Sequence, residues 1–142
     1  MRCGKTRTLD GMPTITLGVD GTLMSLNWDA QGDGDYLASV EAEAEGFKGH
    51  ADGHVTGSDL KAFFEGLRKL EHTRKGKAVL ISAAPDEFEV TVQAVDGVGH
   101  MGVVGMLRYT SLGSERPTQI LRFEFDFEPN QLLDAVKATH AV

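Results

Sequence analysis

This sequence of 142 residues lacks a second cysteine, long apolar runs and an apolar segment after its early bases. The single cysteine, Cys3, can form no internal disulfide, which is typical of a protein of the reducing cytoplasm. Apolar runs extend over only a few residues, so we expect no membrane-spanning helix. The early bases Arg2, Lys5 and Arg7 are followed by no apolar segment, so we predict no secretory signal and a cytoplasmic location.

Basic residues are scarce in the first part of the chain. Between Asp10 and Asp59 there are ten acidic residues and one base, Lys48, whereas Leu60 to Lys77 holds six bases and two acids. The net charge of −7 argues against a nucleic-acid partner, because binding by counterion release requires a basic footprint. The charged blocks are either solvated faces or an acidic surface that attracts a basic protein.

The stretch from Ser58 to Glu71 predicts the main helix, because apolar residues recur there at helical spacing and charged residues fill the other side. We expect Ser58 to be its N-cap and Gly76 to stop the helix or to lie in the loop after it. A hydrophobic content of 41% in 142 residues suits one domain with a core. We predict a loose lead-in over residues 1–13 and a single α+β domain over residues 14–142.

Most of the remaining chain alternates with the period of β-strands. Thr14–Val19 and Thr22–Trp28 flank Asp20-Gly21, a strong signal for a two-residue hairpin. Such a loop would pair Val19 with Thr22, Leu17 with Met24 and Ile15 with Leu26, which brings the apolar residues onto one face.

Further strands are expected downstream. A second two-residue hairpin at Asp96-Gly97 would pair Val92 with Met101 and place Phe88 opposite Gly105. A turn at Asp52-Gly53 is also expected, and a short helix should follow Pro129. The sequence thus predicts an antiparallel sheet of about seven strands with one main amphipathic helix packed on it, the other strands being Tyr36–Phe47, Lys77–Ala83, Phe88–Val95, Val98–Thr110 and Gln119–Glu128.

No motif for metal or cofactor chemistry has the context it needs. Residues 97–102 match G-x-G-x-x-G, but they lie across a hairpin and lead into a strand rather than a helix. Residues 29–35 resemble the start of a calcium loop, but Val40 occupies the place of the bidentate carboxylate. His50 and His54 would point to opposite faces beside a turn, or lie about 13 Å apart along a strand, too far to share an ion. We predict no metal and no cofactor.

Catalytic residues are not evident either. His100 has no carboxylate or nucleophile motif beside it, and no serine has a nucleophile-elbow context. We therefore predict no catalytic residue, although a site assembled from distant residues is an alternative. Binding to a protein partner is assigned to the acidic loop and strand, namely Asp29, Asp33, Asp35, Glu41, Glu43 and Glu45.

Several features follow one another in a distinctive order over Ile15 to Ala138. They are Trp28, the acidic alternating strand, Gly46-Phe47-Lys48-Gly49, Ser58-Asp59-Leu60 with the helix, Gly99-His100-Met101, Val103-Val104-Gly105 and Leu121-Arg122-Phe123-Glu124-Phe125. This order resembles a bacterial domain family that includes the WapI-type immunity proteins, although Glu128-Pro129-Asn130 departs from the pattern of that family. The resemblance implies a small cytoplasmic binder that neutralises a toxin, and it carries no catalytic residues.

Three functions are compatible with the sequence. The first is a non-enzymatic protein-binding module, an immunity protein whose acidic surface covers a basic toxin domain. The second is a homodimer or larger homo-oligomer of structural or regulatory use, formed through an exposed edge strand. The third is a hydrolase or small-ligand binder, which a deep pocket holding His100 or His54 beside a carboxylate would favour.

Overall fold

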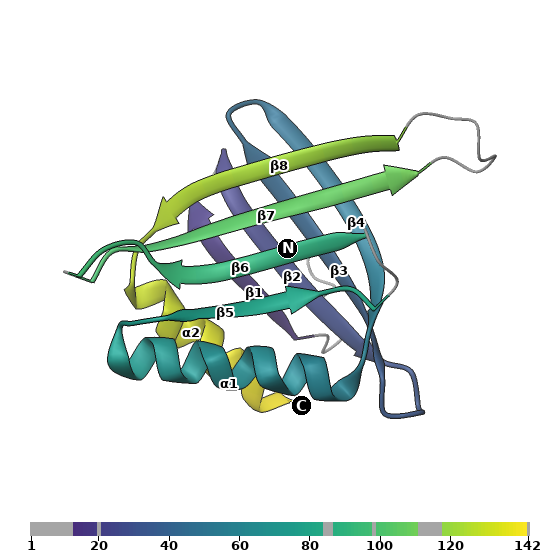
Figure 1. Ribbon diagram of the computed structural model, residues 1–142, viewed down its shortest axis with the longest axis horizontal. Coiled ribbons are helices and arrows are strands. Elements are labelled where there is room, and N and C mark those ends of the chain that lie inside the picture. The colour runs from purple at the N-terminus through teal and green to yellow at the C-terminus, as the bar shows by residue number, and fades with distance from the viewer. Residues whose placement is uncertain (1–12, 20, 84–86, 98, 111–117, 142) are drawn as a thin grey trace, which may run out of the picture.

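Alternating strands and one apolar helical stripe build the architecture of the computed structural model (Figure 1). The structure describes residues 13–19, 21–83, 87–97, 99–110 and 118–141; residues 1–12 of the expected lead-in, Asp20 of the first turn, and Val98 lie outside this set. The elements are β1 (Thr14–Val19), β2 (Thr22–Ala30), β3 (Tyr36–Ala44), β4 (Phe47–Val55), α1 (Gly57–Thr73), β5 (Lys77–Ile81), β6 (Phe88–Ala94), β7 (Met101–Thr110), β8 (Thr118–Phe127), α2 (Asn130–Ala138) and a short 3₁₀ helix (Thr139–Ala141).

The described strands form two antiparallel sheets of four, in the orders β1-β2-β3-β4 and β5-β6-β7-β8. The predicted α+β class is confirmed, with eight strands in two sheets where about seven in one were expected. The helix α1 stands between β4 and β5, so each group of four hairpin-connected strands pairs within itself. Figure 1 shows the β5–β8 sheet crossing obliquely in front of the β1–β4 sheet, with α1 along β5 and α2 beside α1.

The core lies between the two sheets and under α1. The ring of Trp28 packs on Phe64 of α1 at a centroid distance of 4.8 Å, and both side chains are almost fully buried. Trp28 is therefore a core residue. The apolar stripe of α1 is buried as predicted, and burial of such side chains is worth about 1.5–3 kcal/mol each; it consists of Leu60, Phe63, Phe64, Leu67 and Leu70.

The helix α1 begins one residue earlier than predicted, and the assignment of its N-cap to Ser58 is wrong. Thr56 is the N-cap, because its extended backbone lets its Oγ1 accept a hydrogen bond from the Asp59 N–H at 3.1 Å. At the other end, Arg74 adopts the left-handed conformation, and its N–H closes the last turn. Gly76, also at positive φ, lies in the loop beyond the cap.

The first hairpin has the predicted register, with Val19 opposite Thr22 and Leu17 opposite Met24. The single strand predicted over Tyr36–Phe47 is wrong, since β3 ends at Ala44 and a turn at Glu45-Gly46 leads into β4. Both turn residues have positive φ, 50° and 91°, which a two-residue hairpin turn requires. Glu-Gly is a weaker turn signal than Asn-Gly or Asp-Gly, so the alternation of the strand predicted no break at this position.

The predicted turn at Asp52-Gly53 is wrong as well, because both residues lie inside β4 and pair with Ser39 and Ala38 of β3. Gly53 allows close packing and does not form a turn. A Cβ there would lie 2.8 Å from the Phe88 ring and 2.8 Å from Ser82. The missing side chain thus lets β4 approach the other sheet closely.

The register of the second hairpin is shifted by two residues from the prediction. The connection between β6 and β7 runs from Val95 to His100, so Val92 pairs with Val103 and Phe88 with Leu107. The Val95 N–H donates to the His100 carbonyl across the base of this loop at 2.8 Å. The connection therefore has six residues where two were expected. Asp96-Gly97 lies within it and does not form a two-residue turn by itself.

The strand β8 and the helix α2 follow their predictions closely. Phe123, Phe125 and Phe127 point into the core, whereas their charged neighbours point outward. The helix α2 follows Pro129 and is fixed to β1 by Gln131, whose side chain donates to the Gly18 carbonyl at 2.8 Å and accepts from the Gly18 N–H at 3.1 Å. This pair of hydrogen bonds joins the two ends of the described chain.

Candidate partner-binding surface

The outward side of the β1–β4 sheet carries a band of charged side chains. Successive residues of a strand point to opposite sides, so inward Val40, Ala42 and Ala51 leave their polar neighbours outside. We call this band the carboxylate face, and define it as Asp29, Glu41, Glu43, Lys48, His50, Asp52 and His54. Four carboxylates thus stand against one lysine, so the face is negative while its histidines are neutral.

The register places a basic group opposite each glutamate of β3. His50 lies opposite Glu41 and Lys48 opposite Glu43. The His50 Nδ1 is 3.5 Å from a Glu41 carboxylate oxygen. The strand β4 thus carries a base opposite both glutamates of β3. Such exposed pairs contribute about 1 kcal/mol or less to stability, so they can rearrange around a partner.

Beside this pair, Asp52 binds two neighbours through one oxygen. Its Oδ1 accepts a hydrogen bond from the Ser39 hydroxyl at 2.6 Å and lies 2.8 Å from the His50 Nε2. The serine proton is therefore directed to the carboxylate and not to the histidine, which is the wrong order for nucleophile activation. Among the described residues, no group of three or more His, Cys, Asp or Glu side chains is placed to hold a metal ion.

A depression of about 350 Å³ opens in the carboxylate face. The backbone of Ala42 and Gly49 forms its floor, since the Ala42 side chain and the space beside Gly49 both face the core. Glu41 with His50 and Glu43 with Lys48 form its sides. A long cationic side chain could therefore enter between two carboxylates.

The loop residue Asp35 is engaged in the fold. One of its carboxylate oxygens is 3.1 Å from the His54 Nε2, and the other accepts from the Gly57 N–H at the start of α1. The hydrogen bond with His54 is the main cause, and the Gly57 N–H the second, of a pKa for Asp35 below its usual value. Asp33 accepts from the Asp35 N–H at 3.0 Å, which closes the loop. Asp35 thus fixes the β2–β3 loop to α1.

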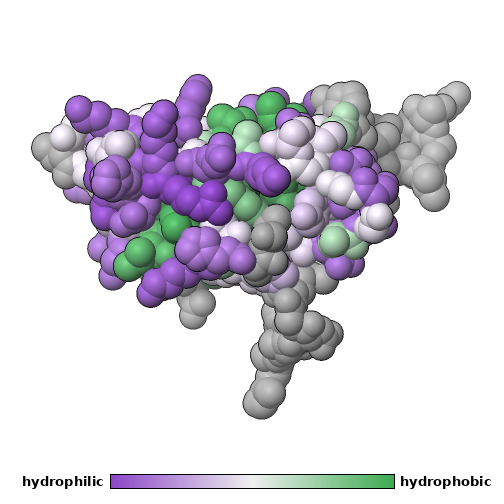
Figure 2. All heavy atoms as spheres, turned by 90° about the horizontal axis from the view of Figure 1, so that it is seen from below, coloured by the Kyte–Doolittle hydropathy of each residue, from purple (hydrophilic) through white to green (hydrophobic). Residues whose placement is uncertain are grey.

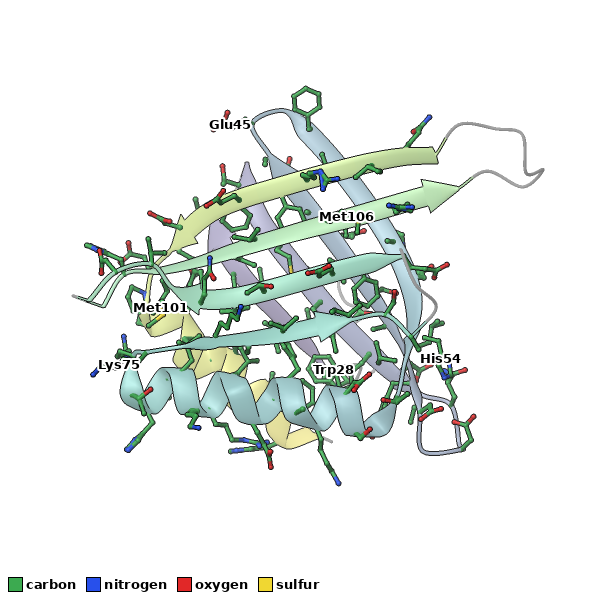
Figure 3. All side chains as sticks on the ribbon, in the orientation of Figure 1. Trp28, Glu45, His54, Lys75, Met101 and Met106 are labelled. Atoms are coloured by element: carbon green, nitrogen blue, oxygen red, sulfur yellow. The ribbon has the colours of Figure 1, made fainter. Side chains whose placement is uncertain are left out.

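The six acidic residues predicted to bind a partner therefore fall into three groups. Asp29, Glu41 and Glu43 share the outward face, whereas Asp33 and Asp35 lie in the loop at one end of the sheet. Glu45 lies in the turn at the other end, as its distance from His54 in Figure 3 shows.

Sequence reasoning did not include the residues of β4 in this surface. Lys48, His50, Asp52 and His54 alternate with apolar or small residues, which is the period of a strand. The turn predicted at Asp52-Gly53 concealed this pattern, because it sent the two histidines to opposite sides.

A second concave region lies where β1, β2, β8 and the loop before β7 meet. It has a volume of about 770 Å³, and His100 lines it together with Asp126 and Glu128. The His100 Nδ1 lies 2.5 Å from the Asp96 carboxylate, and this hydrogen bond is the main cause of a raised pKa for His100. The groove has the histidine beside carboxylates that a small-ligand binder would need, but a raised pKa makes His100 a weaker general base at neutral pH.

Comparison with known families gives one match. The model of the immunity protein WapI-like family matches residues 15–142, nearly the whole described chain. The chain belongs to this family. No significant match is found among curated proteins or solved structures. Membership confirms the resemblance drawn from the sequence, and an immunity protein acts by binding a protein partner.

The helices add one negative finding. Within the described ranges, no helix combines the length and the apolar character that crossing a bilayer requires. The outer side of α1 is hydrophilic over most of its length, as the view from below shows (Figure 2).

Proposed function

We propose that this protein is a non-enzymatic immunity protein, and that it neutralises a toxin by covering a basic surface with its carboxylate face. The family match carries the first part of this proposal. The positions of exposed Glu41 and half-buried Glu43, on one face and beside a depression, support the second. The remaining acidic residues, Asp33, Asp35 and Glu45, extend the negative charge to both ends of the sheet.

Electrostatic attraction should speed the association of the carboxylate face with a basic partner. Opposite charges on two surfaces raise the association rate of proteins by steering the encounter, and salt screens this effect over about 10 Å at 0.1 M. The depression adds specificity, since a lysine or arginine of the partner would meet Glu41 and Glu43 together. Arginine suits this site best because its planar group can bind carboxylates in a bidentate manner.

Capture followed by a growth assay tests the proposal. The protein is immobilised, a lysate of its host is applied at low salt, and the retained protein is identified by mass spectrometry after release at high salt. That protein is then expressed in a sensitive strain with and without this chain. We expect one basic partner that arrests growth alone and does not do so in the presence of this chain.

Charge variants test whether the carboxylate face is the surface that binds the partner. The pair Glu41→Gln and Glu43→Gln should weaken protection, whereas the matched pair Glu65→Gln and Asp134→Asn, exposed on α1 and α2, should not. Full protection by the variant with Glu41→Gln and Glu43→Gln would show that the carboxylate face does not bind the toxin. A retained protein that never arrests growth would reject the immunity function itself.

A further inference from the structure

The outward side of the β5–β8 sheet differs in chemistry from the carboxylate face. Val79, Ile81 and Ile120 are 36%, 47% and 44% exposed there, and Val104 and Met106 lie between them, half-buried. Figure 3 shows Met106 on this sheet, which faces the viewer. We call this surface the apolar face, and define it as Lys77, Val79, Ile81, Glu89, Thr91, Gln93, Val104, Met106, Arg108, Ile120, Arg122, Glu124 and Asp126.

The strand register arranges the apolar face in rows that run across the four strands. One row is Ile81, Glu89, Met106 and Arg122. The next is Val79, Thr91, Val104 and Glu124. Corresponding members of the two rows are both apolar on β5 and on β7, and they are opposite in charge on β8.

These rows are complementary to each other, and we infer that the apolar face binds a second copy of this chain. A two-fold axis that lies across the strands between the two rows brings each row against the other row of the partner. Met106 then meets Val104, Ile81 meets Val79, and Arg122 meets Glu124, each contact occurring twice. The arrangement is an isologous contact between two sheets packed face to face.

Charge supports a second copy over a basic partner at this surface. The apolar face holds three cations, Lys77, Arg108 and Arg122, and three anions, Glu89, Glu124 and Asp126. It is therefore neutral, although the whole chain carries a net charge of −7. Two copies can meet here without facing like charge, whereas a basic toxin is drawn to the carboxylate face.

Shape and size set the strength of the contact. A concavity of about 460 Å³ lies over Val104 and Met106, with Glu89 and Arg122 at its margin, and a partner's side chains can fill it. Four strands about 4.8 Å apart and up to ten residues long present roughly 500 Å² per copy, at the lower limit of specific interfaces. We expect a dimer with a dissociation constant on the order of 10 µM. The carboxylate faces would lie on its two outer sides.

Sedimentation velocity of the full chain between about 1 µM and 1 mM tests this inference. We expect a monomer at the lowest concentration and a dimer at the highest. Met106→Lys should weaken dimerisation at least tenfold, whereas Leu37→Lys, at an exposed apolar site on the other sheet, should leave it unchanged. A monomer throughout, or a dimer indifferent to Met106→Lys, would overturn the inference, and the second result would indicate pairing through a strand edge. Far-UV circular dichroism checks that both variants fold.

A mixing experiment tests the proposed pairing of Arg122 with Glu124. The variants Arg122→Glu and Glu124→Arg should each be monomeric, because each brings like charges together across the axis. An equimolar mixture should form a heterodimer, since every pair across the axis is then opposite in charge. Contacts within one chain cannot produce this recovery. If the mixture stays monomeric while the wild type dimerises, the proposed axis is wrong.

Discussion

The ring of Phe123 in β8 lies over Gly105 in β7 and occupies the space of the missing side chain. The two residues are directly opposite in the β7–β8 register. A Cβ at position 105 would overlap the tip of the Phe123 ring and also lie 2.7 Å from a neighbouring ring carbon. An aromatic residue thus covers a bare stretch of backbone inside the sandwich, a known means of compensating a glycine in a strand.

Replacement of Gly105 by alanine should therefore destabilise the protein. We expect a loss of about 1–3 kcal/mol in the free energy of unfolding, because the Phe123 ring must leave its site in a packed core. Urea denaturation followed by tryptophan fluorescence measures this loss through Trp28. Gly97→Ala is the matched control, since a Cβ there meets nothing within 4 Å. Equal stability of the two variants would show that the ring moves without cost.

The Asp35 carboxylate should make stability depend on pH at the acidic end. Its pKa is lowered by His54 and by the Gly57 N–H, so the folded state favours the ionised form. This stabilisation is complete above the unfolded-state pKa of about 3.9 and disappears as the pH falls through the lower folded-state pKa.

Melting temperatures of the wild type and Asp35→Asn between pH 2 and 7 measure this effect. The variant should melt lower at neutral pH, and the two curves should converge in strong acid. Asp29→Asn, exposed on β2, should follow the wild type at every pH. A constant difference between the wild type and Asp35→Asn at all values of pH would contradict the role of ionisation.

The pairing of His100 with Asp96 makes the opposite prediction. The pKa of His100 is raised, so this pair stabilises the fold below the unfolded-state value of about 6.5 and ceases to do so as the pH rises through the raised value. A titration of the histidine ring protons by NMR should show His100 above that value. Asp96→Asn should lower the pKa of His100, and Asp134→Asn should leave it unchanged. A pKa for His100 that does not respond to Asp96→Asn would assign the shift to Asp126 and Glu128.

Much of the fold could be predicted because its patterns are local. The helix α1 and the strand β8 have clean periods, and the Asp20-Gly21 signal determines the register of β1 with β2. Turn signals failed where tertiary contacts decide. Gly53 is a packing residue beneath Phe88, and no local feature of Asp52-Gly53 distinguishes this use from a turn.

The candidate site could be predicted only in part for the same reason. The alternation of Glu41 and Glu43 with apolar residues places them outside from the sequence alone. The neighbours of Asp52 come from β3 and from its own strand, and only the register of β3 with β4 brings Ser39 to it. The loop role of Asp35 depends on His54, nineteen residues away, and so required the fold.

Association kinetics test the central claim, that the carboxylate face captures a basic toxin. The association rate constant with the captured growth-arresting protein is measured by stopped flow at about 20 mM and 500 mM salt. We predict that Glu41→Gln with Glu43→Gln slows association roughly tenfold at low salt and little at high salt, because screening removes the steering. The control pair Glu65→Gln and Asp134→Asn should retain the rate of the wild type. Equal rates and equal salt dependence for all three proteins would contradict the account.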